Sequence, residues 1–184
     1  IFNITENDLT LYGSGTMTEY TESSTAPWYN NRTSIKKVDV SGISSISKYA
    51  FRDCEKITTF TLSKGSTYFA IGKTDGALYT TGEQHLIKYP VGKTHTGTFN
   101  IPQTVKEIYP YAVESSTFNK ITIPTGVTSI GTYAFKDNKL LIEFTDFTGT
   151  AYESVNGVLF TKGQIELIQY PAKKTAIKYY IPET

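Results

Sequence analysis

Val127-Thr-Ser-Ile-Gly-Thr-Tyr-Ala-Phe135 is the segment that decides the fold, because close copies of it occur elsewhere in the chain. One copy is Ile43-Ser-Ser-Ile-Ser-Lys-Tyr-Ala-Phe51, and another is Val105-Lys-Glu-Ile-Tyr-Pro-Tyr-Ala-Val113. Ala112 and Ala134 occupy the same place in two of the copies and are 22 residues apart. A fixed period of about 20 to 50 residues is the signature of a repeat protein, whose stacked units share one core.

Short segments between these copies alternate apolar and polar residues. Phe60-Thr-Leu62 and Ile121-Thr-Ile123 are examples, and Pro124 follows the second one directly. This alternation predicts a short strand with one buried face, and a proline ends such a strand because it has no N–H to donate. No segment keeps a helical period over 11 or more residues. The sequence therefore predicts a mainly β, right-handed leucine-rich-repeat solenoid with short parallel strands and few or no long helices.

A longer unit is superimposed on the 22-residue period. Strand-like runs on either side of Gly82 and of Gly163 predict a β-hairpin in each of two repeats. We expect a cap over residues 1–34 and a repeat array over 35–184, as a fragment of a longer array. The hairpin-bearing repeats lie near 63–104 (the first hairpin repeat) and 146–184 (the second hairpin repeat). The matching segments are Asp75–Thr80 with Asn156–Thr161, Leu86–Pro90 with Leu167–Pro171, and Ile101–Thr104 with Ile181–Thr184.

The chain resembles the BspA-like, or Treponema pallidum type, leucine-rich repeat family. That family has a V-x-x-I-G-x-x-A-F core and an L-x-x-I-x-I-P strand, which Val127–Phe135 and Ile121–Pro124 match. Departures are Val113 in place of Phe, Ser47 in place of Gly, and the unusual Pro110. The resemblance implies an extracellular or cell-surface location and a role in adhesion. The N-terminal part resembles the family's entry segment at Leu9–Leu11, Gly13–Met17, Ala26–Tyr29 and Ile35–Val38.

Composition excludes several other classes of protein. Among 184 residues, 18 Lys and Arg nearly balance 17 Asp and Glu, so no basic charge excess favours nucleic-acid binding. The single cysteine, Cys54, excludes an internal disulfide and a Cys-rich metal site. No apolar run approaches the roughly 18 residues of a membrane span. We therefore expect no nucleic-acid partner and no membrane span in this chain.

Residues with catalytic chemistry are few and scattered. His85 and His95 are the only histidines, and the second hairpin repeat has Glu166 and Ala176 at about their places. Cys54 is interpreted as a small buried packing residue. No Ser-His-Asp set, phosphate loop or zinc spacing occurs, and no pair stands out among the acids, although folding could bring two together. We expect no enzyme activity, no cofactor and no metal.

Two surfaces are candidates for binding a partner. Tyr79, Tyr89, Phe160 and Tyr170 are the hairpin aromatics, which either present flat rings to a ligand or pack on the solenoid. The other surface is the outward side of the predicted strands, which is otherwise an ordinary solvated sheet face. Its residues, called the polar stripe below, are Lys37, Asp39, Thr59, Thr61, Thr98, Asn100, Lys120, Thr122, Glu143 and Thr145.

The functional hypothesis is a non-catalytic, surface-displayed or secreted protein that binds a protein or glycoprotein ligand of host matrix or cells. The alternatives are a carbohydrate-binding module that uses the hairpin aromatics and a passive spacer of a larger surface protein. A cluster of three lysines near the end of the chain is either an ordinary solvated surface or a contact for acidic glycans. Asn3 and Asn31 begin glycosylation sequons. The clustered lysines are Lys173, Lys174 and Lys178.

Overall fold

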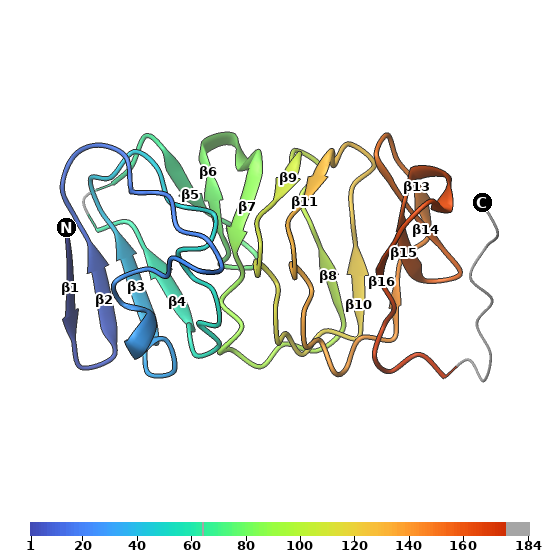
Figure 1. The fold of residues 1–184 in the computed structure, drawn as a ribbon, viewed down its shortest axis with the longest axis horizontal. Helices are drawn as coiled ribbons and strands as arrows, with labels where there is room; N and C mark the ends of the chain where they lie inside the picture. Colours follow the sequence, from blue (N-terminus) through green and yellow to red (C-terminus); the bar gives the residue numbers. More distant parts are fainter. Residues whose placement is uncertain (64, 176–184) are drawn as a thin grey trace.

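The computed structural model describes residues 1–63 and 65–175, which form a β-solenoid of about five turns (Figure 1). Its turns follow one another along the long axis, from the N-terminal strands to a C-terminal sheet. Within these residues no helix reaches seven residues. The predicted mainly β repeat solenoid with few or no long helices is confirmed.

One column of strands contains the segments that the sequence predicts as strands. It consists of two sheets, with strand orders β1-β2-β3-β4 and β8-β10-β12. All pairings in it are parallel except the N-terminal β1–β2 hairpin. The strands are β1 Phe2–Thr5, β2 Asp8–Leu11, β3 Lys37–Val40, β4 Thr59–Thr61, β8 Thr98–Asn100, β10 Lys120–Thr122 and β12 Glu143–Phe144, and a 3₁₀ turn, η1 Tyr29–Asn31, precedes β3.

A second column forms one sheet in the order β5-β6-β7-β9-β11. Its first three strands are antiparallel, whereas β7, β9 and β11 are parallel. The sequence analysis missed β9 and β11, because a two-residue strand is too short to show alternation. The elements are β5 Phe69–Ile71, β6 Leu78–Thr80, η2 Thr81–Glu83, β7 His85–Lys88, β9 Glu107–Ile108 and β11 Ser129–Ile130.

The second hairpin repeat forms a separate antiparallel sheet in the order β13-β14-β15-β16. Both predicted hairpins, β6–β7 and β15–β16, are confirmed, and Gly82 and Gly163 in their turns have the same φ of 77°. Each has an additional strand before it, β5 or β14, which the sequence analysis missed. Residues 176–184 of this repeat lie outside the described residues. The elements are β13 Phe147–Thr148, β14 Tyr152–Val155, β15 Val158–Thr161, η3 Lys162–Gln164 and β16 Leu167–Gln169.

Hydrogen bonds between successive turns reproduce the period of the sequence. The N–H of Thr58 donates to the carbonyl of Lys36 at 2.7 Å, and that of Thr128 donates to the carbonyl of Lys106 at 2.8 Å. In both pairs the threonine hydroxyl donates to the same carbonyl, at 3.1 and 3.2 Å, across a separation of 22 residues. Each turn is therefore held in register by its predecessor.

The core lies between the two columns. The phenyl rings of Phe51 and Phe135 are buried, with centroids 5.7 and 5.2 Å from the rings of Phe60 and Phe144. These edge-to-face contacts place the Ala-Phe segments in the core. The alanine of each motif copy is also buried. Ala50 and Ala134 directly precede these phenylalanines, and Ala112 precedes Val113 in the remaining copy.

An ion pair is enclosed in this core. The Nζ of Lys88 lies 2.6 Å from Oε1 of Glu114 and 2.9 Å from the carbonyl oxygen of Tyr111, and both charged side chains are fully buried. Burial raises the pKa of Glu114, and the attraction of Lys88 opposes that rise. The pair links β7 to the next turn.

Burial also raises the pKa of Cys54 to about 12, so its thiol is protonated, in agreement with the packing interpretation.

Replacement of Phe135 with alanine should lower the free energy of unfolding by about 3–5 kcal/mol, because it removes a buried ring shared with β12. Urea unfolding followed by circular dichroism measures this loss. Leu140→Ala is the control, because Leu140 is exposed and should cost little. An unchanged midpoint in Phe135→Ala would refute the core role.

Lys88→Met should cost about 3–5 kcal/mol, because it leaves the carboxylate of Glu114 buried without its cation. The double variant Lys88→Met/Glu114→Leu should recover most of that loss, since it removes both buried charges. Urea unfolding of the single and double variants checks this. Additive losses in the double variant would contradict the proposed dependence of each charge on the other.

Candidate partner-binding surfaces

The polar stripe lies on the outward side of the first column, as expected from the alternation. Its residues are exposed or partly exposed, while Val38, Phe60, Phe99, Ile121 and Phe144 on the same strands are buried. The stripe does not lie on one continuous sheet. Within residues 1–63 and 65–175 no strand pairing joins β4 to β8, so it has two segments. One segment is Lys37, Asp39, Thr59 and Thr61, and the other is Thr98, Asn100, Lys120, Thr122, Glu143 and Thr145.

Several stripe side chains bond to one another across neighbouring strands. Lys120 forms an ion pair with Glu143 at 2.6 Å, and the hydroxyls of Thr122 and Thr145 are 2.8 Å apart. Lys37 lies 3.7 Å from Asp8, which is outside the stripe. Such cross-strand pairs stabilise the sheet by about 0.2–1 kcal/mol each. These residues therefore have a structural role besides any contact with a partner.

Asp39 is the stripe residue with the largest structural role. Its carboxylate accepts hydrogen bonds from the hydroxyls of Ser41 at 3.0 Å and Thr61 at 3.1 Å, and from the N–H of Ser63 at 2.9 Å. Burial acts to raise the pKa of Asp39, but these hydrogen bonds outweigh it and hold the pKa below its usual value. Asp39 thus fixes the segment that leaves β4.

Thr98 and Asn100 differ from the rest of the stripe. Both are exposed on β8, and within the described part of the chain neither side chain has a hydrogen-bond or ionic partner. They face Lys120 and Thr122 of the next strand. A partner could use their polar atoms without breaking an internal bond, which makes them the most accessible part of the stripe.

The hairpin aromatics do not form the flat exposed surface considered from the sequence. Tyr79, Tyr89 and Phe160 are buried, and Tyr170 is only partly exposed. Tyr79 donates its hydroxyl to Asp75 at 2.7 Å, and Tyr89 packs 4.8 Å from the ring of Phe99. Three of the four rings thus belong to the core, and the packing alternative is correct for them.

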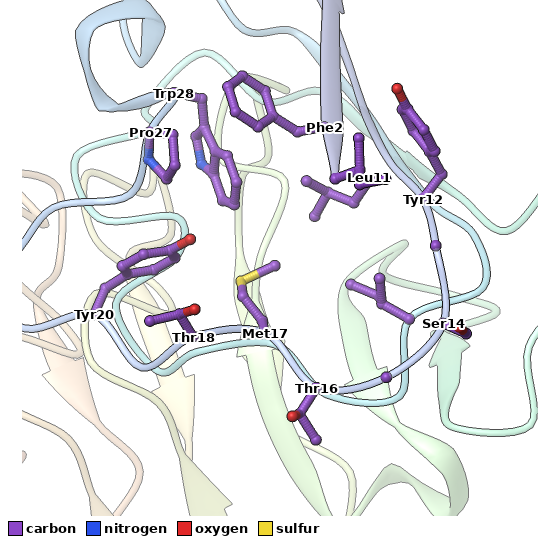
Figure 2. A pocket seen from close by; sticks show the side chains of 14 residues that line it. Phe2, Leu11, Tyr12, Ser14, Thr16, Met17, Thr18, Tyr20, Pro27 and Trp28 are labelled. Atoms are coloured by element: carbon purple, nitrogen blue, oxygen red, sulfur yellow. The ribbon is translucent and has the colours of Figure 1, made fainter.

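A cavity of about 470 Å³ opens beside the N-terminal hairpin (Figure 2). Its wall includes Phe2, Tyr12, Met17, Tyr20 and Trp28, and among the residues that the structure describes no acidic or basic side chain lines it. The indole nitrogen of Trp28 donates to the carbonyl of Ala50 at 2.8 Å, which fixes that ring on the first turn. The cavity suits an uncharged ligand with an apolar face. The sequence analysis missed it, because its residues come from separate segments of the cap and from Ile43 of the first repeat.

The loop that encloses this cavity is held to the first turn by polar contacts. The N–H of Met17 donates to the hydroxyl of Ser45 at 3.2 Å, and that of Tyr20 donates to the hydroxyl of Ser47 at 2.7 Å. The N–H of Ser44 donates in return to a loop carbonyl, that of Gly15, at 2.9 Å. The cavity wall is thereby fixed to the array.

The remaining candidates from the sequence are dispersed. His85 lies in β7 with Nδ1 3.7 Å from Glu107, and His95 packs on Tyr89 with ring centroids 5.3 Å apart. In residues 1–63 and 65–175 no group of three acidic, His or Cys side chains could hold a metal ion, and no helix is long and apolar enough to cross a membrane. The sequon residues Asn3 and Asn31 are both exposed. Lys173 and Lys174 are exposed or partly exposed, and Lys178 lies outside the described residues.

Comparison with known proteins identifies the family of the chain. A family model described as BspA type leucine rich repeat region matches six copies over residues 17–73 and 92–181. The chain belongs to this family. Its repeats are those of a leucine-rich-repeat protein, and the resemblance found in the sequence is confirmed. No curated protein matches the chain.

Solved structures of bacterial leucine-rich proteins are similar to this chain. The pneumococcal vaccine antigen PcpA is 25% identical over 60% of the chain, with a TM-score of 0.55, and the chain spans 27% of that protein. A leucine rich cell surface protein of Faecalibacterium prausnitzii is 17% identical over 99% of the chain and 62% of its own length, with a TM-score of 0.44. A leucine-rich repeat protein of Eubacterium ventriosum is 18% identical over 77% of the chain and 68% of its own, with a TM-score of 0.32.

Acid should weaken the fold partly through Asp39. Since its pKa is lower in the folded chain, its ionised form stabilises the fold above the usual pKa of an aspartate, and that contribution is lost as the pH falls from about 5. Asp39→Asn should unfold at lower urea than the wild type at pH 7, and its midpoint should fall less between pH 6 and pH 3. Thr98→Ala is the control, and its urea midpoint should fall between pH 6 and pH 3 as much as that of the wild type. An equal response in Asp39→Asn would contradict the assignment.

Proposed function

We propose that this chain belongs to a surface-displayed or secreted protein that acts by binding, without catalysis, and mediates adhesion to a protein or glycoprotein of host matrix or cells. Membership of the BspA-type family and the similarity to PcpA, a vaccine antigen, support surface exposure. The observation that carries the binding surface is the exposed pair Thr98 and Asn100 on β8, whose side chains have no hydrogen-bond or ionic partner among the described residues. Solenoids offer extended surfaces of this kind to their partners.

The arrangement of the stripe supports contact over several turns. Thr98 and Asn100 stand directly opposite Lys120 and Thr122, so hydroxyl, amide and ammonium groups lie in adjacent rows. The buried Phe99 and Ile121 behind them anchor both strands in the core. A fixed backbone with short side chains loses little conformational entropy on binding. We therefore place the centre of the proposed interface on β8 and β10.

The test is binding of the folded chain to a panel of matrix proteins and epithelial cells, measured by biolayer interferometry and flow cytometry. Saturable binding to a panel member, lost on unfolding, is expected. The double variant Thr98→Glu/Asn100→Lys should weaken it at least tenfold, because it changes the size and charge of both accessible side chains. Thr148→Glu, also at an exposed strand position but outside the stripe, is the matched control.

Deglycosylation of the partner separates the proposal from its alternatives. Binding that survives deglycosylation supports protein recognition. Loss of binding on deglycosylation, together with sensitivity to Tyr12→Ala in the N-terminal cavity, would favour a carbohydrate-binding module, which the uncharged aromatic lining of that cavity supports. A complete absence of binding by the folded chain would favour the spacer.

A further inference from the structure

The segment between Gly92 and Gly97 leads from the first hairpin repeat into β8, and both of its ends are fixed to neighbouring turns. At one end the N–H of Gly92 donates to the carbonyl of Ile57 at 2.7 Å. At the other end the carbonyl of Gly97 accepts a hydrogen bond from the N–H of Asn119 at 3.1 Å. We call residues 93–96, between these two points, the β8 loop.

His95 is the residue that holds the β8 loop to the core. Its N–H donates to the hydroxyl of Thr117 at 2.9 Å, and the same hydroxyl donates to the carbonyl of His95. Thr94 and Thr96 on either side are exposed and have no hydrogen bond to the described residues. The position of the middle of the loop therefore depends on His95.

The imidazole of His95 lies against aromatic rings. Its centroid is 5.3 Å from that of Tyr89 and 5.8 Å from that of Phe118, which stacks on Phe99 of β8 at 5.1 Å. The side chain as a whole is partly exposed, but its Nε2 is buried and has no hydrogen-bond partner among the described residues. A neutral imidazole can carry its proton on Nδ1, whereas an imidazolium has an N–H on both nitrogens and a positive charge. This site therefore suits the neutral ring.

The charged and titratable groups around His95 leave the protonated ring without compensation. Removal from water lowers the pKa of His95, and the positive charge of Lys93 in the same loop lowers it further. Asp75, between β5 and β6, opposes this effect without cancelling it. Burial raises the pKa of Tyr89, so its phenol is neutral, and residues 117–118 carry no charge.

We propose that protonation of His95 releases the β8 loop from the core, so that the loop acts as a pH-sensitive latch at the start of β8. The imidazolium gains a charge and a second donor that the aromatic site cannot accept, and turning into solvent satisfies both. Its departure breaks the hydrogen bonds to Thr117 and loosens Gly97, which aligns β8 with β10. Because a histidine in water binds its proton below about pH 6.5, release becomes easier as the pH falls below that value.

The consequence for a ligand rests on the adhesion function proposed above. Thr98 and Asn100 follow the β8 loop directly, and they are the accessible part of the polar stripe. A change in the alignment of β8 would displace both side chains relative to Lys120 and Thr122 on β10. We therefore expect acid to weaken ligand binding at this part of the stripe.

The test is amide hydrogen exchange of the whole chain by NMR at pH 7.5 and pH 5.5, corrected for the intrinsic pH dependence of exchange. Protection of the Asn119 N–H, which is bonded to the end of the loop, should fall about threefold or more in the wild type. His95→Phe should abolish this fall, because a phenyl ring packs similarly and binds no proton. His85→Phe is the matched control and should respond as the wild type, since it removes the other histidine, which lies beside Glu107 in β7.

Two results would overturn the proposal. One is an NMR titration that gives His95 a pKa of about 6.5 or higher, and the other is an equal loss of protection in His95→Phe. These readouts need no ligand, so absence of binding to the whole panel would contradict the adhesion proposal alone. Where a panel member binds, its affinity for the wild type should fall about threefold at pH 5.5 and its affinity for His95→Phe should not. An unchanged wild-type affinity would refute the link between the loop and the stripe.

Discussion

No turn of this solenoid can bury its apolar face alone, and the rest of the structure depends on that constraint. The buried ring of Phe135 needs Phe144 of the following strand, and the buried charge of Lys88 needs Glu114 of the following turn. The same adjacency aligns the backbone donors of one turn with carbonyls of the previous one, as at Thr58 and Lys36. Stability, register and the regular outer surface therefore have one cause, which is contact between nearest neighbours.

The motif glycine shows how closely the turns approach. A Cβ at Gly131 would lie 2.3 Å from the backbone nitrogen of Pro110 in the preceding turn. Any side chain there would have to separate two turns that share a core. The requirement is thus steric and local, and Ser47 shows that the equivalent position of the first repeat accommodates a side chain that remains buried. Glycine is therefore not required at this position in every repeat.

The sequence predicted those parts of the fold that depend on periodicity. Val38, Phe60 and Ile121 alternate with polar residues, so both the strands and their outward residues were predictable. The two-residue strands β9 and β11 carry too little pattern to be recognised. The burial of Tyr79 and Tyr89 was left open, because a tyrosine in a hairpin packs inward or outward according to what lies against the hairpin. What lies against the hairpin is determined by tertiary packing, which the local sequence does not show.

The candidate sites were likewise predictable only where they depend on the periodicity of the sequence. The outward residues of the stripe were predictable, but their hydrogen bonds were not. These bonds distinguish Asp39, which fixes the segment after β4, from Thr98 and Asn100, whose side chains have no partner among the described residues. The N-terminal cavity is lined by segments that are separated in the sequence, so no local pattern predicts it. In a repeat protein a difference between equivalent positions is informative, because the repeat itself supplies the comparison. Thr98 and Lys120 are paired positions of successive turns, yet within the described residues only Lys120 has an ionic partner, Glu143.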